Sequence, residues 1–256
     1  MKKFVIWTSI IMVISLGAGI TVMICTADFN FERHQTIEEQ HTSLEGTTTI
    51  SIHSISDDIR IVRTDSVELK AELKTYYQNT NTKSRLSVER DQTARKVNIE
   101  TPKNLKLSFF DINWSSELTV YIPKTFTGKL EVDSISANVV ADGLGDIQSI
   151  KIDTTSGDVT VNKVEGEVGA TSVSGDVNVS YTVFIADVKI KTTSGDVKLD
   201  LPSNPSCKFN FNTTSGDLAN TIGLAVSSKR GHFEGKQGDE KYTIVVDTIS
   251  GDLELK

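Results

Sequence analysis

The sequence contains very little cysteine. Cys25 lies in an apolar segment near the N-terminus, and Cys207 is the only thiol in the rest of the chain. An internal disulfide beyond the apolar segment is therefore excluded. The fold must be held by burial of apolar side chains and by hydrogen bonds between strands. Because Cys207 alternates with Phe209 and Phe211, we interpret it as a packed core residue.

An excess of basic charge is also missing. After Ala27 the chain has 25 Lys and Arg residues against 34 Asp and Glu residues, a balance of −9. A domain of this charge is not expected to be a general binder of nucleic acid or of anionic lipid.

The motifs that usually mark an active site are absent as well. There is no His-Glu-x-x-His spacing, no glycine-rich phosphate loop and no Gly-x-Ser-x-Gly elbow. We interpret the four histidines as dispersed surface residues: His34, His41, His53 and His232. The sequence thus predicts no enzyme, no catalytic, cofactor-binding or metal-binding residues, and no cofactor. The alternative is a polysaccharide-active β-helix enzyme, which would need acidic and basic residues that converge on one coil face.

One long apolar run stands near the N-terminus. Phe4 to Cys25 is uncharged, and its 22 residues at about 1.5 Å each span about 33 Å, enough for the core of a bilayer. Lys2 and Lys3 precede it and acidic residues follow, so the positive-inside rule places everything after Ala27 outside the cytoplasm. We expect a retained single-pass anchor in the cell membrane. A cleaved signal peptide is the alternative, because small residues stand near Ala27.

The chain is therefore expected to have three parts. Residues 1–27 are the cytoplasmic tip and transmembrane anchor, or an uncleaved signal. Residues 28–48 are a linker with the first strand, and residues 49–256 are an extracytoplasmic domain of repeated β-strands.

Five copies of one short sequence motif occur in the part of the chain that is expected to be exported. Each reads Ser-Gly-Asp followed by Val or Leu, and the steps from serine to serine are 18, 20, 21 and 35 residues. Repetition at this period is typical of a structural unit and not of a single site. The triplets predicted to form structural repeat corners are Ser156, Gly157, Asp158, Ser174, Gly175, Asp176, Ser194, Gly195, Asp196, Ser215, Gly216, Asp217, Ser250, Gly251 and Asp252.

An alternating stretch precedes each triplet. Ile150, Ile152, Thr154 and Ser156 share one face of an extended chain. The next apolar residue, Val159, would point to the opposite face of a straight strand. Gly-Asp is therefore predicted to be a corner, in which glycine supplies a φ above zero and aspartate bonds its own backbone.

Two all-β architectures fit this pattern. In a single-stranded, right-handed β-helix-like solenoid, each period is one coil, and equivalent residues stack about 4.8 Å apart in parallel ladders. In the alternative, Gly-Asp is a type II′ hairpin turn of an antiparallel meander or barrel. We favour the β-solenoid, because stacking makes each inward Thr or Ser a neighbour of its own kind. A ladder of hydroxyls would supply the partners that buried hydroxyls need.

Two further stretches look like degenerate coils. Ile50 to Ile59 repeats the pattern with Asp57 in place of glycine. Leu130 to Val139 has Ala-Asn where Gly-Asp would stand, and Asn138 tolerates the left-handed conformation, so the corner is expected to survive. Between these coils, two short alternating runs within residues 86–99 predict a hairpin that interrupts the stack.

The repeated aspartates could form a metal site. If the coils stack in register, the carboxylates of Asp158, Asp176, Asp196 and Asp217 lie about 4.8 Å apart, where like charges repel by about 1 kcal/mol even in water. A calcium ion would relieve this repulsion. We favour the alternative, in which each aspartate bonds amides of the corner, because the nonapeptide of calcium-binding β-rolls is absent.

Two insertions are expected to cover the ends of the stack. The aromatic segment with Phe109, Phe110 and Trp114 is either a cap, which we favour, or a glycan-binding platform. The 35-residue step leaves a surplus within Ala219–Lys241, which predicts a hairpin that folds over the end of the stack with Phe233 against the core. Its alternative role is contact with a partner.

The repeated Ser-Gly-Asp-Val units, the Ile122-Pro123 strand end and the terminal phrase Val246–Leu253 resemble the putative-adhesin family of bacterial β-strand-repeat envelope proteins, which includes membrane proteins of the Lia type. The resemblance covers about residues 45–256. It implies a β-helix-like exported domain without demonstrated enzymatic activity. We therefore expect a non-enzymatic, membrane-anchored interaction module, an adhesin or cell-envelope stress component. Its expected partner is a cell-envelope polymer or a membrane protein, and not nucleic acid.

Overall fold

The structure, a computed structural model, describes residues 34–77, 86–101 and 115–256. In these ranges the regular elements are β-strands, and no helix there is long and apolar enough to cross a membrane. The anchor predicted at Phe4–Cys25 lies outside the described residues. All described residues after His34 belong to one unit, Gln35–Lys256.

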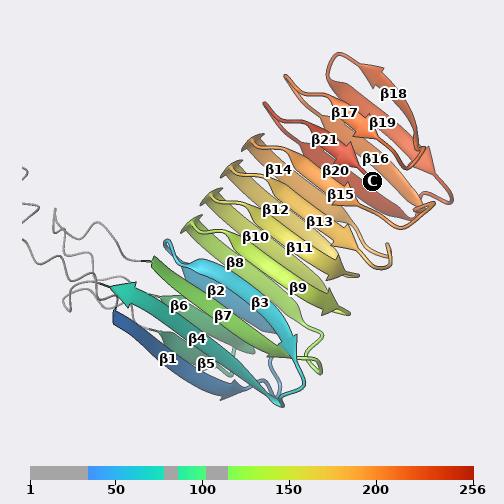
Figure 1. Ribbon diagram of the computed structural model, residues 1–256. Coiled ribbons are helices and arrows are strands. Elements are labelled where there is room, and N and C mark those ends of the chain that lie inside the picture. Colours follow the sequence, from blue (N-terminus) through green and yellow to red (C-terminus); the bar gives the residue numbers. More distant parts are fainter. Residues whose placement is uncertain (1–33, 78–85, 102–114) are drawn as a thin grey trace, which may run out of the picture. The chain divides into compact units, whose positions relative to one another are not determined.

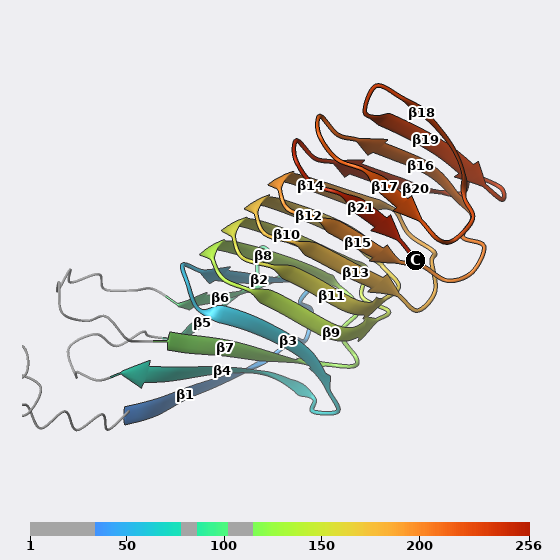
Figure 2. The ribbon, with the colours of Figure 1, turned by 45° about the horizontal axis from the view of Figure 1, so that its top comes forward.

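The strands form two sheets that enclose one apolar core (Figures 1 and 2). Sheet A contains β1 (His34–Ser43), β3 (Asp58–Thr64), β4 (Glu68–Tyr77), β7 (Ser115–Pro123), β9 (Val139–Gly145), β11 (Val159–Val164), β13 (Val177–Tyr181), β15 (Val197–Asp200), β17 (Leu218–Asn220) and β21 (Leu253–Leu255). Sheet B contains β2 (Thr49–Ser54), β5 (Ser87–Asp91), β6 (Lys96–Thr101), β8 (Lys129–Ser136), β10 (Ser149–Ser156), β12 (Glu167–Ser174), β14 (Val188–Ser194), β16 (Cys207–Asn212), β18 (Ala225–Lys229), β19 (His232–Gln237) and β20 (Tyr242–Asp247).

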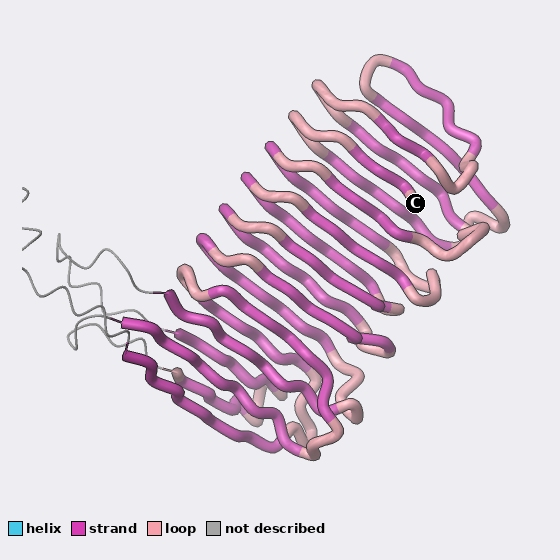
Figure 3. The backbone as a smooth tube through the Cα atoms, in the orientation of Figure 1, coloured by secondary structure: helices cyan, strands magenta, loops and turns pink. Residues whose placement is uncertain are grey.

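Each coil of the repeat consists of one strand of sheet B, a corner, and one strand of sheet A. β10 pairs in parallel with β8 and β12, and β11 pairs in parallel with β9 and β13. The register joins equivalent positions, so Ile150 lies opposite both Leu130 and Val168. The turns line up along two edges of the stack (Figure 3). The predicted β-solenoid is confirmed for the repeats as a stack of two-strand coils, and the antiparallel meander is wrong there.

The alternation of side chains explains why these segments form half-buried strands. In β14, Val188, Ile190 and Thr192 are buried, whereas the intervening Lys189 and Lys191 are exposed. Period-two alternation places one set of side chains on each face of a strand. Each fully buried Val or Ile contributes about 1.5 to 3 kcal/mol, and every repeated coil supplies several.

At the C-terminal end, the order of the coils in space differs from their order in the sequence. β20 pairs with both β14 and β16, and β21 pairs with both β15 and β17. After β15 the chain forms β16 and β17, which are not next to β14 and β15. It continues through β18 and β19 and then forms β20 between β14 and β16, and β21 between β15 and β17. The last coil of the sequence is therefore not the last coil of the stack.

The hairpin of β18 and β19 covers the end of sheet B. β19 pairs antiparallel with the outer edge of β16. Phe233 of β19 stacks on Phe211 of β16 with ring centroids 5.3 Å apart. The predicted hairpin over the end of the stack, with Phe233 against the core, is confirmed.

At the N-terminal end of the stack, antiparallel strands also pair with the strands of the outermost coil. The coil of β6 and β7 lies next to the coil of β2 and β3, with β6 parallel to β2 and β7 parallel to β3. β5 pairs antiparallel with β6, and β4 pairs antiparallel with β7. The predicted hairpin within residues 86–99 is confirmed as β5 and β6. It does not interrupt the stack, however, because β6 is itself a coil strand.

At this end, side chains of β1 in sheet A form hydrogen bonds with backbone groups at the edge of sheet B. Glu38 Oε2 accepts a hydrogen bond from Leu86 N at 3.0 Å, and Gln40 Oε1 accepts one from Val88 N at 3.0 Å. Gln40 Nε2 also donates to Leu86 O at 2.7 Å. Two side chains of one sheet thus satisfy backbone groups that the edge of the other sheet would leave unpaired.

Cys207 is expected to be unreactive in the folded protein. It is fully buried with Phe209 and Phe211, which confirms the core interpretation, and burial raises the pKa of its thiol to about 11. Since the thiolate is the reactive form, a Cys25→Ser variant should react with an aromatic disulfide at neutral pH at least tenfold more slowly when folded than when unfolded in urea. Rapid labelling of the folded variant would contradict the burial of this side chain.

Candidate functional site

The five predicted corners line one edge of the stack. Each Ser-Gly-Asp triplet follows a strand of sheet B and precedes a strand of sheet A. The triplet at Ser250 lies between those at Ser194 and Ser215, so the fourth and fifth copies of the sequence are exchanged in space. The order along the edge is Ser156-Gly157-Asp158, Ser174-Gly175-Asp176, Ser194-Gly195-Asp196, Ser250-Gly251-Asp252 and Ser215-Gly216-Asp217.

Close packing between coils requires the row of glycines. A Cβ at any of the five would lie 2.1 to 2.2 Å from a backbone carbonyl oxygen of the neighbouring coil. The backbone is left-handed in φ only at Gly157, with 129°, and at Gly175, with 146°. The predicted reason, a φ above zero, therefore holds at two corners, whereas the lack of room for a side chain applies at all five. Asn138 also keeps its corner without a positive φ.

The corner carboxylates form a ladder of hydrogen bonds with amides. In each step, Oδ1 of one aspartate accepts a hydrogen bond from the backbone N–H of the equivalent residue in the next coil. The carboxylates of Asp158, Asp176 and Asp196 accept in this way at 2.9 Å, and that of Asp252 accepts from Asp217 N at 2.8 Å. Asn138 continues the ladder toward the N-terminus, with its side-chain oxygen 3.0 Å from Asp158 N.

These bonds support the amide interpretation of the aspartates over the calcium interpretation. Each Oδ1 of the ladder faces an N–H of the next corner, which is a partially positive donor. Within residues 34–77, 86–101 and 115–256, no group of three His, Cys, Asp or Glu side chains is placed to hold a metal ion.

The hydroxyl residues differ from the expectation. Thr154, Ser172 and Thr192 are buried, but the serine two positions later in each coil is exposed, because the chain already turns there. The hydroxyls of Ser172 and Thr192 have no hydrogen-bond partner among the described residues. Stacked hydroxyls do bond at the N-terminal coils, where Thr101 Oγ1 donates to Ser54 Oγ at 3.2 Å. The predicted ladder of mutually bonded hydroxyls is therefore wrong for the coils of Ser172 and Thr192.

A row of exposed branched side chains runs beside the serines. Ile135, Val173 and Ile249 are 55%, 47% and 55% exposed, although large apolar residues usually lie inside. Threonine occupies the same position at Thr155 and Thr193. This edge of the stack therefore presents three exposed parallel rows: one of branched residues, one of serines and one of aspartates. We call these three rows the corner edge.

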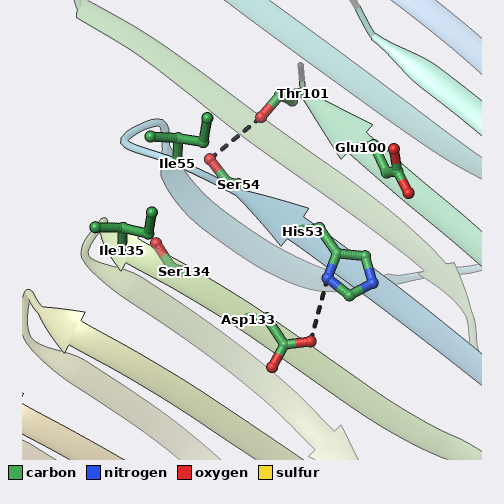
Figure 4. A pocket seen from close by; sticks show the side chains of 8 residues that line it. All are labelled: His53, Ser54, Ile55, Glu100, Thr101, Asp133, Ser134 and Ile135. Atoms are coloured by element: carbon green, nitrogen blue, oxygen red, sulfur yellow. Dashed lines mark hydrogen bonds and ion pairs between the residues drawn. The ribbon is translucent and has the colours of Figure 1, made fainter. Parts of the chain in front are cut away.

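A cavity of about 330 Å³ lies near the corner edge on the outward face of sheet B (Figure 4). His53 of β2 lines it, with Nδ1 3.1 Å from Asp133 Oδ2 of β8. Glu100 of β6 lies on the other side of His53. Ile55 and Ile135 stand on the side toward the corner.

The sequence interpretation of His53 as a dispersed surface residue missed this arrangement. Aligning the two degenerate coils would have placed His53 opposite Asp133, as the register has it. No comparable sequence signal identifies Glu100, because β6 pairs with β2 although β3, β4 and β5 lie between them in the sequence.

A buried carboxylate stands at the glycine position of the first coil. Asp57 is fully buried and accepts hydrogen bonds from the hydroxyls of Ser54, at 2.9 Å, Thr101, at 2.5 Å, and Ser116. It thereby joins the end of β6 to the start of β7. The aromatic residues predicted as a cap or platform, Phe109, Phe110 and Trp114, lie outside the described residues.

Comparison with known proteins addresses the family of the chain. Among solved structures, one described as a putative cell adhesion protein from Clostridium sporogenes is 15% identical, with a TM-score of 0.55 over 87% of this chain and 99% of that chain. A putative adhesin from Bacteroides fragilis is 10% identical, with a TM-score of 0.36 over 86% of this chain and 97% of that chain. No curated protein matches the sequence significantly.

The first of these structures shares the fold of this chain. The sequence also matches the family model Toastrack DUF4097 over residues 126–256, which is just over half of the chain and includes all five triplets. The chain therefore belongs to the Toastrack DUF4097 family.

Proposed function

We propose that this chain is a non-enzymatic, membrane-anchored interaction module outside the cytoplasm, an adhesin-like or envelope-stress component of the Lia type. The corner edge carries the proposal. Its three rows repeat equivalent side chains about every 4.8 Å, which suits an extended partner such as a cell-envelope polymer. The Clostridium sporogenes structure of similar fold is described as a putative cell adhesion protein, which agrees with this role.

The proposed anchor is the uncharged run Phe4–Cys25, with Lys2 and Lys3 before it. The orientation follows from the positive-inside rule. A protease added to wall-stripped cells should then digest the domain, and before digestion the domain should remain with the membrane fraction. A soluble form that begins at Asp28 would show a cleaved signal instead.

The binding role is tested with the full chain in membrane vesicles that are incubated with purified envelope polymer. The double variant Val173→Glu, Thr193→Glu adds two charges to the corner edge and should reduce retention of the polymer at least fivefold. The double variant Thr160→Glu, Asn178→Glu adds the same charges to half-exposed positions on the outward face of sheet A, and it should bind like the parent.

Equal retention by the two double variants would contradict the corner edge as the binding surface. Release of cleaved product from a panel of acidic polysaccharides would support the alternative, a β-helix enzyme. Such an enzyme needs converging acidic and basic groups, so its turnover should not depend on Val173 and Thr193.

A further inference from the structure

Three polar side chains form a row along the cavity of sheet B. Glu100, His53 and Asp133 are register partners on the adjacent strands β6, β2 and β8. Figure 4 shows the imidazole between the two carboxyl groups, with Ile55 and Ile135 on the side toward the corner. The cavity thus has one charged side and one apolar side.

The nitrogen and carboxylate atoms left free in this row are hydrogen-bond acceptors. A carboxylate only accepts, so His53 Nδ1, 3.1 Å from Asp133 Oδ2, carries the proton of this hydrogen bond. In the neutral ring Nε2 is then an acceptor. The Glu100 carboxylate forms no hydrogen bond or ion pair with any other residue that the structure describes.

Two other carboxylates on this face of sheet B are paired with lysines. Glu131 Oε2 lies 2.9 Å from Lys96 Nζ, and Asp153 pairs with Lys151. The described lining of the cavity contains no Lys or Arg. In the described lining, therefore, no lysine or arginine is paired with Glu100 or Asp133, and these carboxylates lie beside an apolar wall.

We propose that this cavity binds a primary ammonium group on an aliphatic arm, of the kind that a lysine side chain of a partner presents. An ammonium carries three hydrogen-bond donors and no acceptor, which complements Glu100, Asp133 and Nε2 of His53. Its methylene arm packs against Ile55 and Ile135, as long charged side chains do on apolar surface.

The size and the lining of the cavity favour this ligand over a sugar. About 330 Å³ is near the lower limit for small-ligand sites, so the cavity has room for one side chain. The described lining contains no aromatic residue on which a sugar ring could stack. The inference goes beyond the proposed envelope role and does not depend on it.

The test uses the full chain in detergent micelles, titrated with Nα-acetyl-lysine N-methylamide and followed by the NMR signals of the histidine rings. The His53 signal should shift with saturation in the millimolar range, while the His232 signal should not move. Nα-acetyl-norleucine N-methylamide has the same arm without the charge and should cause no saturable shift.

Three variants locate the site. Glu100→Gln and Asp133→Asn should each weaken binding about fivefold, which is the upper range for an exposed ion pair. Glu234→Gln is the matched control, because Glu234 Oε1 lies 2.8 Å from His232 Nε2 on sheet B but outside the cavity. This variant should bind like the parent.

Several results would overturn the proposal. Equal affinity for the norleucine compound would show an apolar cleft only, and tighter binding of glucosamine would show a sugar site. Unchanged affinity in both cavity variants, or an equal shift at His232, would show that the amine binds the surface without a site. Each result leaves the envelope test unaffected, since that test changes other residues.

Discussion

Replacing Gly195 with valine is expected to destabilise the domain by about 3 kcal/mol or more, because overpacking against fixed backbone is among the costliest substitutions. A Cβ at this position would lie 2.1 Å from the carbonyl oxygen of Gly175. No side-chain rotation relieves that contact, so the two coils must separate at the corner. Separation also breaks the hydrogen bond from Asp196 N to Asp176 Oδ1. The measurement is the urea midpoint of the full chain, followed by circular dichroism.

The structure offers a matched control for this substitution. Gly169 lies in β12 of sheet B, and the nearest atom to a Cβ there is Lys151 Cγ at 3.8 Å, an ordinary contact. Valine favours strands, so Gly169→Val should change the free energy of unfolding by less than about 0.5 kcal/mol or stabilise the domain. Similar midpoints for Gly195→Val and Gly169→Val would contradict the packing argument.

The position of the corners could be predicted from the sequence, but their cause could not. The alternation around Ile150 and the return of Val159 to the core face require a turn at Gly157. A glycine in a sequence does not reveal whether it serves a positive φ or a close approach. At Gly195 the answer depends on the carbonyl of Gly175 in another coil, and only the stacked arrangement places the two together.

The burial of the hydroxyl residues shows a similar limit. Thr192 was expected inside from the alternation, and it is buried. Ser194 was also expected inside, but it is exposed because the strand has begun to turn before the glycine. A pattern of period two holds only while the backbone stays extended, and the sequence does not mark the residue at which that ends.

The candidate site was the least predictable part. His53 and Asp133 occupy equivalent positions in two coils whose similarity the sequence shows, so their meeting could have been predicted. Glu100 belongs to a strand that reaches β2 after the chain has passed through β4 and β5. Short connections between neighbouring strands are the usual expectation, and this coil departs from it.

The order of the last two coils was missed for the same reason. The step of 35 residues between Ser215 and Ser250 was interpreted as a protruding insertion, and the hairpin of β18 and β19 is there. A step of this length also allows the chain to form β16 and β17 first and then to return and form β20 between β14 and β16. As a result, β20, the last strand of sheet B in the sequence, pairs with another strand on each side.

This topology predicts that a residue near the end of the chain is essential for the whole stack. Val246 is fully buried in β20, opposite Ile190 on one side and Phe211 on the other. Val246→Asp would place a carboxylate between these two side chains without a partner. Loss of apolar burial together with an unpaired buried charge should cost about 4 kcal/mol or more, a large part of the stability of a domain.

Val226→Asp is the matched control, because Val226 is a half-buried valine of the same sheet in the outermost strand β18. It lies 20 positions earlier in the sequence than Val246 but further out in the stack, and its replacement should cost about 1 kcal/mol or less. Urea midpoints of the two full-length variants decide between the two orders of coils. If β20 were the outermost coil, Val246→Asp would disturb only an end of the stack and the two midpoints would be similar. Because β20 joins β14 to β16, the Val246→Asp variant should unfold at a much lower urea concentration than Val226→Asp.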